Sequence, residues 1–213
     1  MRSHGEIEAA PDQRGLTTTK TNSVNDQPNL TAALGLAAAG ISVFPAGSDK
    51  RPLLVGWQEK ASTEEEQIRQ WWDSYPAALP AIVVGLAGLV VIDCDRHPGG
   101  SDGIKAFNRL LSANGGNLAD VPMTKTARGG AHLFFRQPPG EPLGNGRGEL
   151  PDGIDVRGVG GFVIAPGAES DGKRWQSANG RPSRRRPARG LRRKQVSTGA
   201  RPSRHDENHR ERN

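Results

Sequence analysis

Apolar residues recur along the central part of the chain with the spacings of short helices and strands. Residues 30–40, LTAALGLAAAG, have the period of a helix and follow Asn29, a residue type that often caps a helix N-terminus. A second helix is expected to begin at Thr63, because Thr63 and Glu66 have the spacing of a capping box. The apolar spacing after Ser101 predicts a third helix.

Short apolar runs bounded by Gly, Pro and charged residues predict buried strands. These runs are ISVFPA, AIVVG, LVVIDCD, MTKTA, HLFFR, GIDVRG and GFVIAP. Strands and helices are interspersed without an internal repeat, so we predict one mixed α/β domain over residues 29–176. Residues 1–28 contain almost no large apolar side chain and are expected to be disordered, because they cannot bury enough surface to offset the entropy of ordering.

The net charge of +6 comes from the C-terminal end of the chain. Residues 177–213 hold 12 Lys and Arg against 3 Asp and Glu, which leaves 17 against 20 for the rest. This segment has too few apolar residues for a core, and we expect a disordered, low-complexity tail. Such a tail is either a solvated extension, including one produced by a shifted reading frame, or an aid to nucleic-acid binding through phosphates.

The cysteine content and hydropathy limit the class of protein. Cys94 is the single cysteine, which excludes a disulfide framework and fits a reducing compartment such as the cytoplasm. No apolar run approaches the roughly 20 residues of a membrane span, and the N-terminus lacks the apolar stretch of a signal peptide. We therefore expect a cytoplasmic protein without a membrane partner.

The strand LVVIDCD carries the first candidate chemistry. Alternation along a strand places Asp93 and Asp95 on one face and Cys94 on the other. Two carboxylates at the end of a buried strand repel each other unless a cation neutralises them, and hard oxygen ligands suit Mg²⁺ or Mn²⁺. A strand that ends in a polar turn produces the same pattern without a metal. A zinc site of Cys94, His97 and His132 is a weaker alternative, because Cys94 points away from the aspartates.

Two later segments add candidate residues. In GIDVRG, Asp155 and Arg157 share a face, so Asp155 is a candidate third carboxylate, although the pair is also typical of a structural salt bridge. In TARGGAHLFFR, two glycines precede His132, which is either an ordinary hydrogen-bonded residue or a phosphate donor beside a metal site. Four cations are candidates for phosphate or template contacts, or are solvated surface residues: Lys50, Arg51, Arg128 and Arg157.

Taken together and in order, these motifs resemble the N-terminal domain of the bifunctional DNA primase/polymerase family, within the archaeo-eukaryotic primase superfamily. The segments that carry the resemblance are VFPAGSDKRPLLVGWQ, the helix with Trp71 and Trp72, LVVIDCD, TARGGAHLFF and GIDVRGVGGFVIAPG. The resemblance covers roughly residues 30 to 175. It implies an α+β fold in which helices flank a mixed, largely antiparallel sheet.

The resemblance also implies a function. The family's acidic pair, its histidine and its later aspartate fall on Asp93 and Asp95, on His132 and on Asp155. Two divalent ions, Mg²⁺ or Mn²⁺, are then bound by the three carboxylates, and His132 contacts the phosphates of the incoming nucleotide. The expected partners are a DNA template and primer, nucleoside triphosphates and a separate replicative helicase, since family members often continue into a helicase region.

The leading hypothesis is therefore a DNA primase/polymerase, a nucleotidyltransferase of plasmid, phage or prophage replication. One alternative is a metal-dependent nuclease or phosphoesterase, because the same carboxylates and metals can activate water in place of a sugar hydroxyl. Another is a catalytically silent nucleic-acid-binding remnant of a mobile element. The three carboxylates favour catalysis, and the unusual tail favours the silent remnant.

Overall fold

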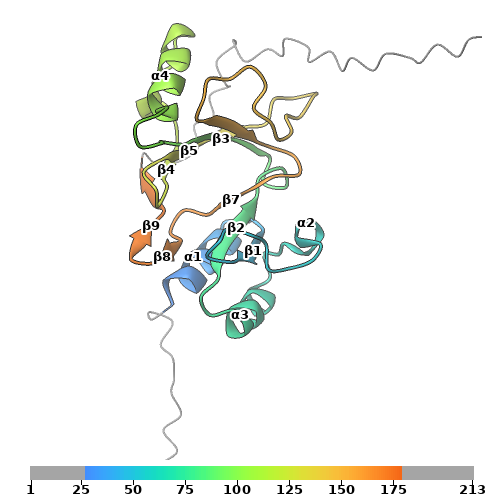
Figure 1. Ribbon diagram of the computed structural model, residues 1–213. Helices are drawn as coiled ribbons and strands as arrows, with labels where there is room; N and C mark the ends of the chain where they lie inside the picture. The colour runs from blue at the N-terminus through green and yellow to red at the C-terminus, as the bar shows by residue number, and fades with distance from the viewer. Residues whose placement is uncertain (1–26, 179–213) are drawn as a thin grey trace, which may run out of the picture.

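The computed structural model describes residues 27–178, which form helices and antiparallel sheets (Figure 1). The helices are α1 (Pro28–Ala38), α2 (Trp57–Lys60), α3 (Glu65–Ser74), α4 (Gly103–Ala113) and the 3₁₀ helix η2 (Leu118–Asp120). The strands are β1 (Val43–Ala46), β2 (Leu79–Val83), β3 (Leu89–Cys94), β4 (Met123–Lys125), β5 (Ala131–Arg136), β6 (Ile154–Arg157), β7 (Phe162–Ile164), β8 (Glu169–Ser170), β9 (Lys173–Arg174) and β10 (Gln176–Ala178). This mixture of helices and largely antiparallel sheets confirms the predicted fold class.

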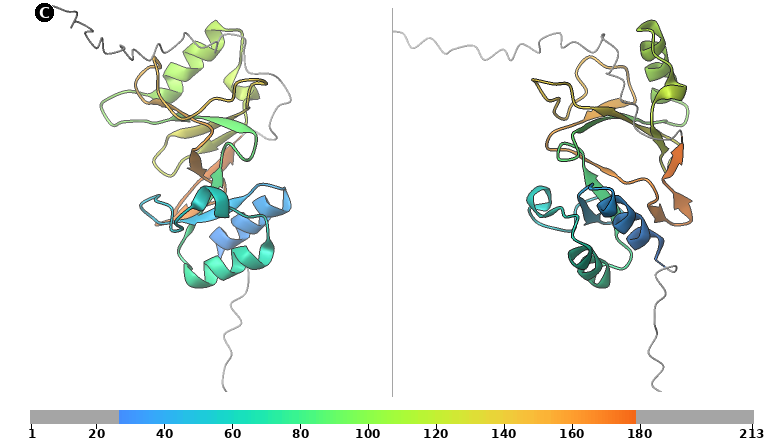
Figure 2. Two further views of the ribbon diagram at one scale, coloured as in Figure 1. Left: turned by 90° about the vertical axis from the view of Figure 1, so that its right-hand side faces the viewer. Right: turned by 180° about the vertical axis from the view of Figure 1, so that it is seen from behind.

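Two sheets make up most of the fold. A three-stranded sheet has the order β1-β2-β7, and a five-stranded sheet has the order β10-β4-β5-β3-β6. Figures 1 and 2 show them one above the other, with α1 and α3 beside the smaller sheet and α4 beside the larger. The chain passes between the sheets from β2 to β3 and again from β6 to β7. The start of β3 and the end of β6 therefore lie toward the junction of the two sheets.

Helix α3 shows why one face of the smaller sheet is covered. Its apolar residues Ile68, Trp71 and Trp72 have helical spacing and are all buried in one core cluster with α1 and β2. Trp72 is fully buried, and its indole N–H donates a hydrogen bond of 3.2 Å to the backbone oxygen of Ala78. The indole thus fills the core without leaving its polar atom unpaired.

Helix α4 covers one face of the larger sheet and leaves the other to face the junction. Ile92 and Cys94 of β3 pack in one cluster with Phe107 and Leu111 of α4. Because side chains alternate along a strand, Asp93 is on the opposite face of β3. The face of the sheet that carries the acidic residue is therefore the one that α4 does not cover.

Both predicted helix caps are wrong. Helix α1 begins at Pro28, and Asn29 lies within it. The side-chain amide of Asn29 donates to the backbone oxygen of Glu169 (2.9 Å) and accepts from the backbone N–H of the same residue (2.7 Å). The cost of burying an amide is offset here by a long-range contact. Helix α3 begins at Glu65 without a side-chain cap, and its preceding turn is held by Ser62, whose hydroxyl accepts from the Glu64 N–H (2.9 Å).

The secondary structure extends slightly past both expected domain limits. Strand β10 pairs with β4 through Ala178, so two residues assigned to the basic tail belong to the larger sheet. Pro28, expected to be disordered, starts α1. The remaining tail, 179–213, and the N-terminal segment 1–26 lie outside the described residues. None of the helices between residues 27 and 178 has the length and apolarity of a membrane span.

Candidate active site

A row of polar residues crosses the uncovered face of the larger sheet. His132 on β5 and Asp155 on β6 are the direct register partners of Asp93 on β3, one on each side. Directly opposed residues of antiparallel strands share a face, with Cβ atoms about 4.5–5.5 Å apart. Strand pairing thus places two carboxylates and an imidazole side by side on one face of the larger sheet.

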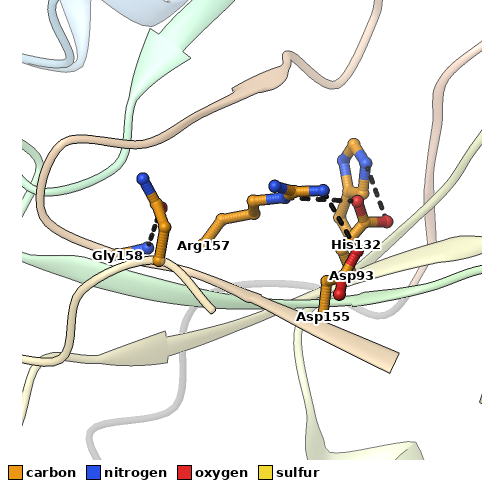
Figure 3. Close-up of polar contacts among 6 residues, drawn as sticks. Asp93, His132, Asp155, Arg157 and Gly158 are labelled. Atoms are coloured by element: carbon orange, nitrogen blue, oxygen red, sulfur yellow. Dashed lines mark hydrogen bonds and ion pairs between the residues drawn. The ribbon is translucent and has the colours of Figure 1, made fainter. Parts of the chain in front are cut away.

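Arg157 links the two carboxylates (Figure 3). It follows Asp155 by two residues on β6 and so lies on the same face. Its Nη2 donates to Asp155 Oδ2 at 3.2 Å, and its Nε lies 3.7 Å from Asp93 Oδ2. The other oxygen of Asp93, Oδ1, is 3.6 Å from His132 Nε2. The salt bridge considered for Asp155 and Arg157 is therefore present, and it includes Asp93 as well.

The electrostatic surroundings disfavour negative charge on Asp93. Burial, and to a lesser extent the neighbouring Asp95 and Asp155, raise the pKa of its carboxyl from 3.8 to about 6 against the opposing effect of Arg157 and Lys50. Only 16% of the side chain is exposed, so water screens these charges weakly. Asp93 is thus a carboxylate that an additional cation would stabilise.

His132 is neutral in this setting. Burial, together with the nearby cations Lys50 and Arg157, lowers its pKa to about 3 against the opposing effect of a hydrogen bond with the backbone of Ile164. Its contact with Asp93 is consequently not an ion pair at neutral pH, and 3.6 Å is long for a hydrogen bond. Within residues 27–178, its buried Nδ1 has no hydrogen-bond partner. A buried imidazole nitrogen that lacks a protein partner is suited to a ligand.

These residues open into a cavity of ≈ 400 Å³ at the junction of the two sheets. Four charged or polar residues line it from the side of the larger sheet: Asp93, His132 and Arg157 on the strands, and Asp95 directly after β3. Residues of β7 and of the segment between β1 and α3 line it from the other side. The volume is within the range of small-ligand sites, and the polar groups converge on one part of it.

Residues 33–190 match the model of a family described as bifunctional DNA primase/polymerase, N-terminal, and the match covers more than half of the 213 residues. The chain belongs to this family. The predicted resemblance is confirmed, and membership supports a function of the DNA primase/polymerase type with DNA and nucleotides as substrates. A search of curated proteins found no match.

Within this primase/polymerase domain, the four predicted cations have different surroundings. Lys50 and Arg157 line the cavity. Arg51 is 86% exposed, outside the cavity lining, and its guanidinium is 3.7 Å from the carboxylate of Asp49. Arg128 is exposed in the turn between β4 and β5, also outside the lining. The structure therefore separates two cavity cations from two surface cations.

The acidic residues offer the hard oxygen ligands that Mg²⁺ and Mn²⁺ prefer. Asp95 follows β3 directly, is exposed, and is the strongest charged neighbour acting on Asp93. Among residues 27–178, no three His, Cys, Asp or Glu side chains are positioned as a complete metal site. Instead, both Asp93 and Asp155 contact Arg157. These carboxylates fit a divalent ion chemically, and in this structure the cation that Asp93 and Asp155 contact is the guanidinium of Arg157.

The alternative zinc site is contradicted by the position of Cys94. The thiol is buried against α4, on the opposite face of β3 from Asp93. Burial and the nearby aspartates raise the pKa of Cys94 to about 12, so the thiol stays protonated. His132 belongs to the cavity face, and the two side chains cannot share a metal.

Several cavity residues were not predicted. Five of them come from separate parts of the chain: Trp57, Thr126, Asn145, Phe162 and Trp175. Asn145 accepts a hydrogen bond of 3.1 Å from the Gly158 N–H (Figure 3), which anchors the loop before β6 to the turn after it. Trp57, Thr126 and Phe162 lie within the segments that carry the family resemblance, whereas Asn145 and Trp175 lie outside them.

Proposed function

We propose that the chain catalyses template-directed nucleotidyl transfer, as a DNA primase/polymerase. The observation that carries this proposal is the register of Asp155 and His132 on either side of Asp93, where Asp93 and His132 line a cavity that also contains two cations. Paired carboxylates beside phosphate-binding cations are the equipment of phosphoryl transfer. The family match supports the general activity.

Asp93, Asp95 and Asp155 are the proposed ligands of two divalent ions, Mg²⁺ or Mn²⁺. When bound, such ions activate a primer 3′-hydroxyl and stabilise the leaving pyrophosphate during in-line displacement. The raised pKa of Asp93 supports this assignment, because a carboxylate that is buried and close to other carboxylates is stabilised by added positive charge. To expose both Asp93 and Asp155 fully, Arg157 has to give up its contacts with them.

His132, Arg157 and Lys50 are the proposed phosphate-binding residues. Neutral His132 can donate one hydrogen bond from an imidazole nitrogen, and it needs no proton from solvent to do so. Arg157 can move from the carboxylates to a triphosphate and bind it with two parallel hydrogen bonds. Lys50 supplies a compact positive charge on the opposite wall of the cavity.

The two exposed cations are assigned to DNA. Arg51 and Arg128 lie outside the cavity lining, where phosphate contacts can position a template or primer without reading its bases. We place the activity in replication of a plasmid, phage or prophage, with cytoplasmic location and a separate replicative helicase as further expectations. Loss of Arg128 should weaken DNA binding equally for unrelated sequences.

A primer-extension assay tests the proposal. Wild type should extend a primer on a DNA template with Mg²⁺ or Mn²⁺ and release pyrophosphate, whereas Asp93→Ala should not. Deoxynucleotides and ribonucleotides are supplied in parallel reactions, with primer-free reactions for priming. A primer that becomes shorter, without pyrophosphate release, would identify a nuclease instead. Equal incorporation by wild type and Asp93→Ala would refute the assigned mechanism.

A further inference from the structure

The cavity has an aromatic side that the proposed chemistry does not use. Trp57, Phe162 and Trp175 line it together with the acidic and basic residues already described. Carboxylates, imidazole and guanidinium come from the larger sheet, whereas Trp57 is on α2 and Phe162 on β7. A ligand that fills this cavity therefore meets carboxylates, imidazole and guanidinium on one side, and aromatic rings together with Lys50 on the other.

Trp57 is supported from behind by other rings. Its ring centroid lies 4.8 Å from that of Phe44, at an interplanar angle of 32°, and 5.0 Å from that of Phe162, at 70°. Phe44 and Phe162 also contact each other edge to face, with centroids 5.3 Å apart. Phe44 is fully buried, while Trp57 retains partial exposure. Three mutually packed rings hold the indole in a defined orientation.

The backbone also positions this tryptophan. Gly56, directly before it, has φ 67° in the left-handed region, and α2 is a single turn that starts with Trp57. Lys50, earlier in the same segment, reaches 5.8 Å from the centroid of the Trp175 ring and lines the cavity as well. The segment between β1 and α3 thus contributes both an aromatic ring and a cation to one cavity.

We propose that Trp57 is the base-stacking wall of the nucleotide site. This inference rests on the proposed function, because it takes a nucleoside triphosphate as the ligand. Such a ligand has a charged triphosphate at one end and a flat aromatic base at the other, and the cavity offers cations for the first and aromatic rings for the second. The triphosphate lies beside Lys50, His132 and Arg157, and the base lies against the indole.

Stacking on Trp57 gives affinity without selecting a base. Every nucleobase has a π face, so an aromatic wall accepts all four, and the choice among them is left to pairing with a template. Stacking is worth about 1–3 kcal/mol per base when the aromatic residue is truncated. Loss of the indole should therefore weaken nucleotide binding by roughly 5- to 150-fold, equally for the four bases.

The test compares nucleotides with inorganic tripolyphosphate, which has the charges but no base. Binding of each of the four deoxynucleoside triphosphates and of tripolyphosphate is measured calorimetrically with Mg²⁺ and without DNA. The proteins are wild type, Trp57→Leu, Trp57→Phe and the control Tyr75→Leu, whose exposed aromatic ring lies outside the cavity lining. Leucine keeps an apolar side chain in contact with Phe44 but removes the stacking face.

We expect Trp57→Leu to lose affinity for all four nucleotides and to keep that for tripolyphosphate within about twofold, with Trp57→Phe in between. Nucleotide-dependent quenching of tryptophan fluorescence should also be smaller in Trp57→Phe, a readout that needs no disruptive substitution. Equal losses for tripolyphosphate and nucleotides, or no loss in either variant, would overturn the inference. If the wild type binds nucleotides through Trp57 but never incorporates them, the proposed function alone is refuted. If the wild type binds no nucleotide, both the proposed function and the role of Trp57 are overturned.

Discussion

Replacing Asp93 by Asn should stabilise the metal-free protein at neutral pH, although Asp93 is a proposed metal ligand. The pKa of its carboxyl is raised from 3.8 to about 6, chiefly by burial and then by Asp95. Each pKa unit corresponds to about 1.36 kcal/mol. At pH 7, where Asp93 is charged in both the folded and unfolded states, the fold is therefore destabilised by about 3 kcal/mol relative to a neutral side chain.

The effect has a defined pH range. Because the pKa of Asp93 is higher in the folded state than in the unfolded state, protonation of its carboxyl stabilises the fold. This stabilisation is complete below about pH 3.8 and is lost as pH rises through about 6. Asn is neutral at every pH, so the Asp93→Asn variant does not lose this stabilisation as pH rises. The difference in unfolding free energy between Asp93→Asn and wild type should thus shrink from about 3 kcal/mol at pH 7 to about 0.5 kcal/mol at pH 4.

Urea unfolding in EDTA at pH 4 and pH 7 measures this difference directly. The low pKa of His132 also makes stability fall as pH decreases below 6.5, but it does so in both proteins and cancels in the comparison. Asp73→Asn, an exposed acid on α3, is the matched control and should change stability by less than about 0.5 kcal/mol. If Asp93→Asn were less stable than wild type at pH 7, the conclusion that burial and nearby carboxylates destabilise the charged Asp93 side chain would be wrong.

Other substitutions test the remaining parts of the site and fold. Asp155→Asn should abolish primer extension while circular dichroism and urea unfolding show an intact fold; normal extension would remove Asp155 from the metal ligands. Arg157→Gln should bind Mn²⁺ on the order of tenfold more tightly without nucleotide, by electron paramagnetic resonance, because no guanidinium neutralises Asp93; unchanged affinity would contradict that competition. Gly103→Ala should destabilise the protein by about 1–3 kcal/mol, because its Cβ would lie close to the backbone oxygen of Gly153. Gly35→Ala, in open space within α1, should instead stabilise it by about 0.5–1 kcal/mol, and the opposite ranking would refute the packing argument.

Local periodicity was sufficient to predict several parts of this protein. The run LVVIDCD determines a buried strand, and its alternation places Asp93 and Cys94 on opposite faces, as the structure confirms. The same rule placed Asp155 with Arg157. Motif order was enough to predict the family. These predictions depend on neighbours within a few residues, and the chain's local geometry constrains such neighbours directly.

Predictions that depended on distant partners succeeded less often. Asn29 has the residue type of a helix cap, but its amide instead pairs with the backbone of Glu169, 140 residues away. Lys50 and Arg51 are adjacent and identical in charge, yet only Lys50 reaches the cavity. No local pattern distinguishes these outcomes, because each is decided by packing between segments that are far apart in sequence.

The site itself shows the same division. Residue types and alternation identify two aspartates and a histidine on strand faces, but they do not say which residues stand opposite one another. Antiparallel pairing of β5, β3 and β6 decides that Asp93 meets His132 and Asp155. A shift of one residue in either pairing would turn one partner to the face that α4 covers. Tertiary structure therefore decides the register, and the register makes separate polar residues into one site.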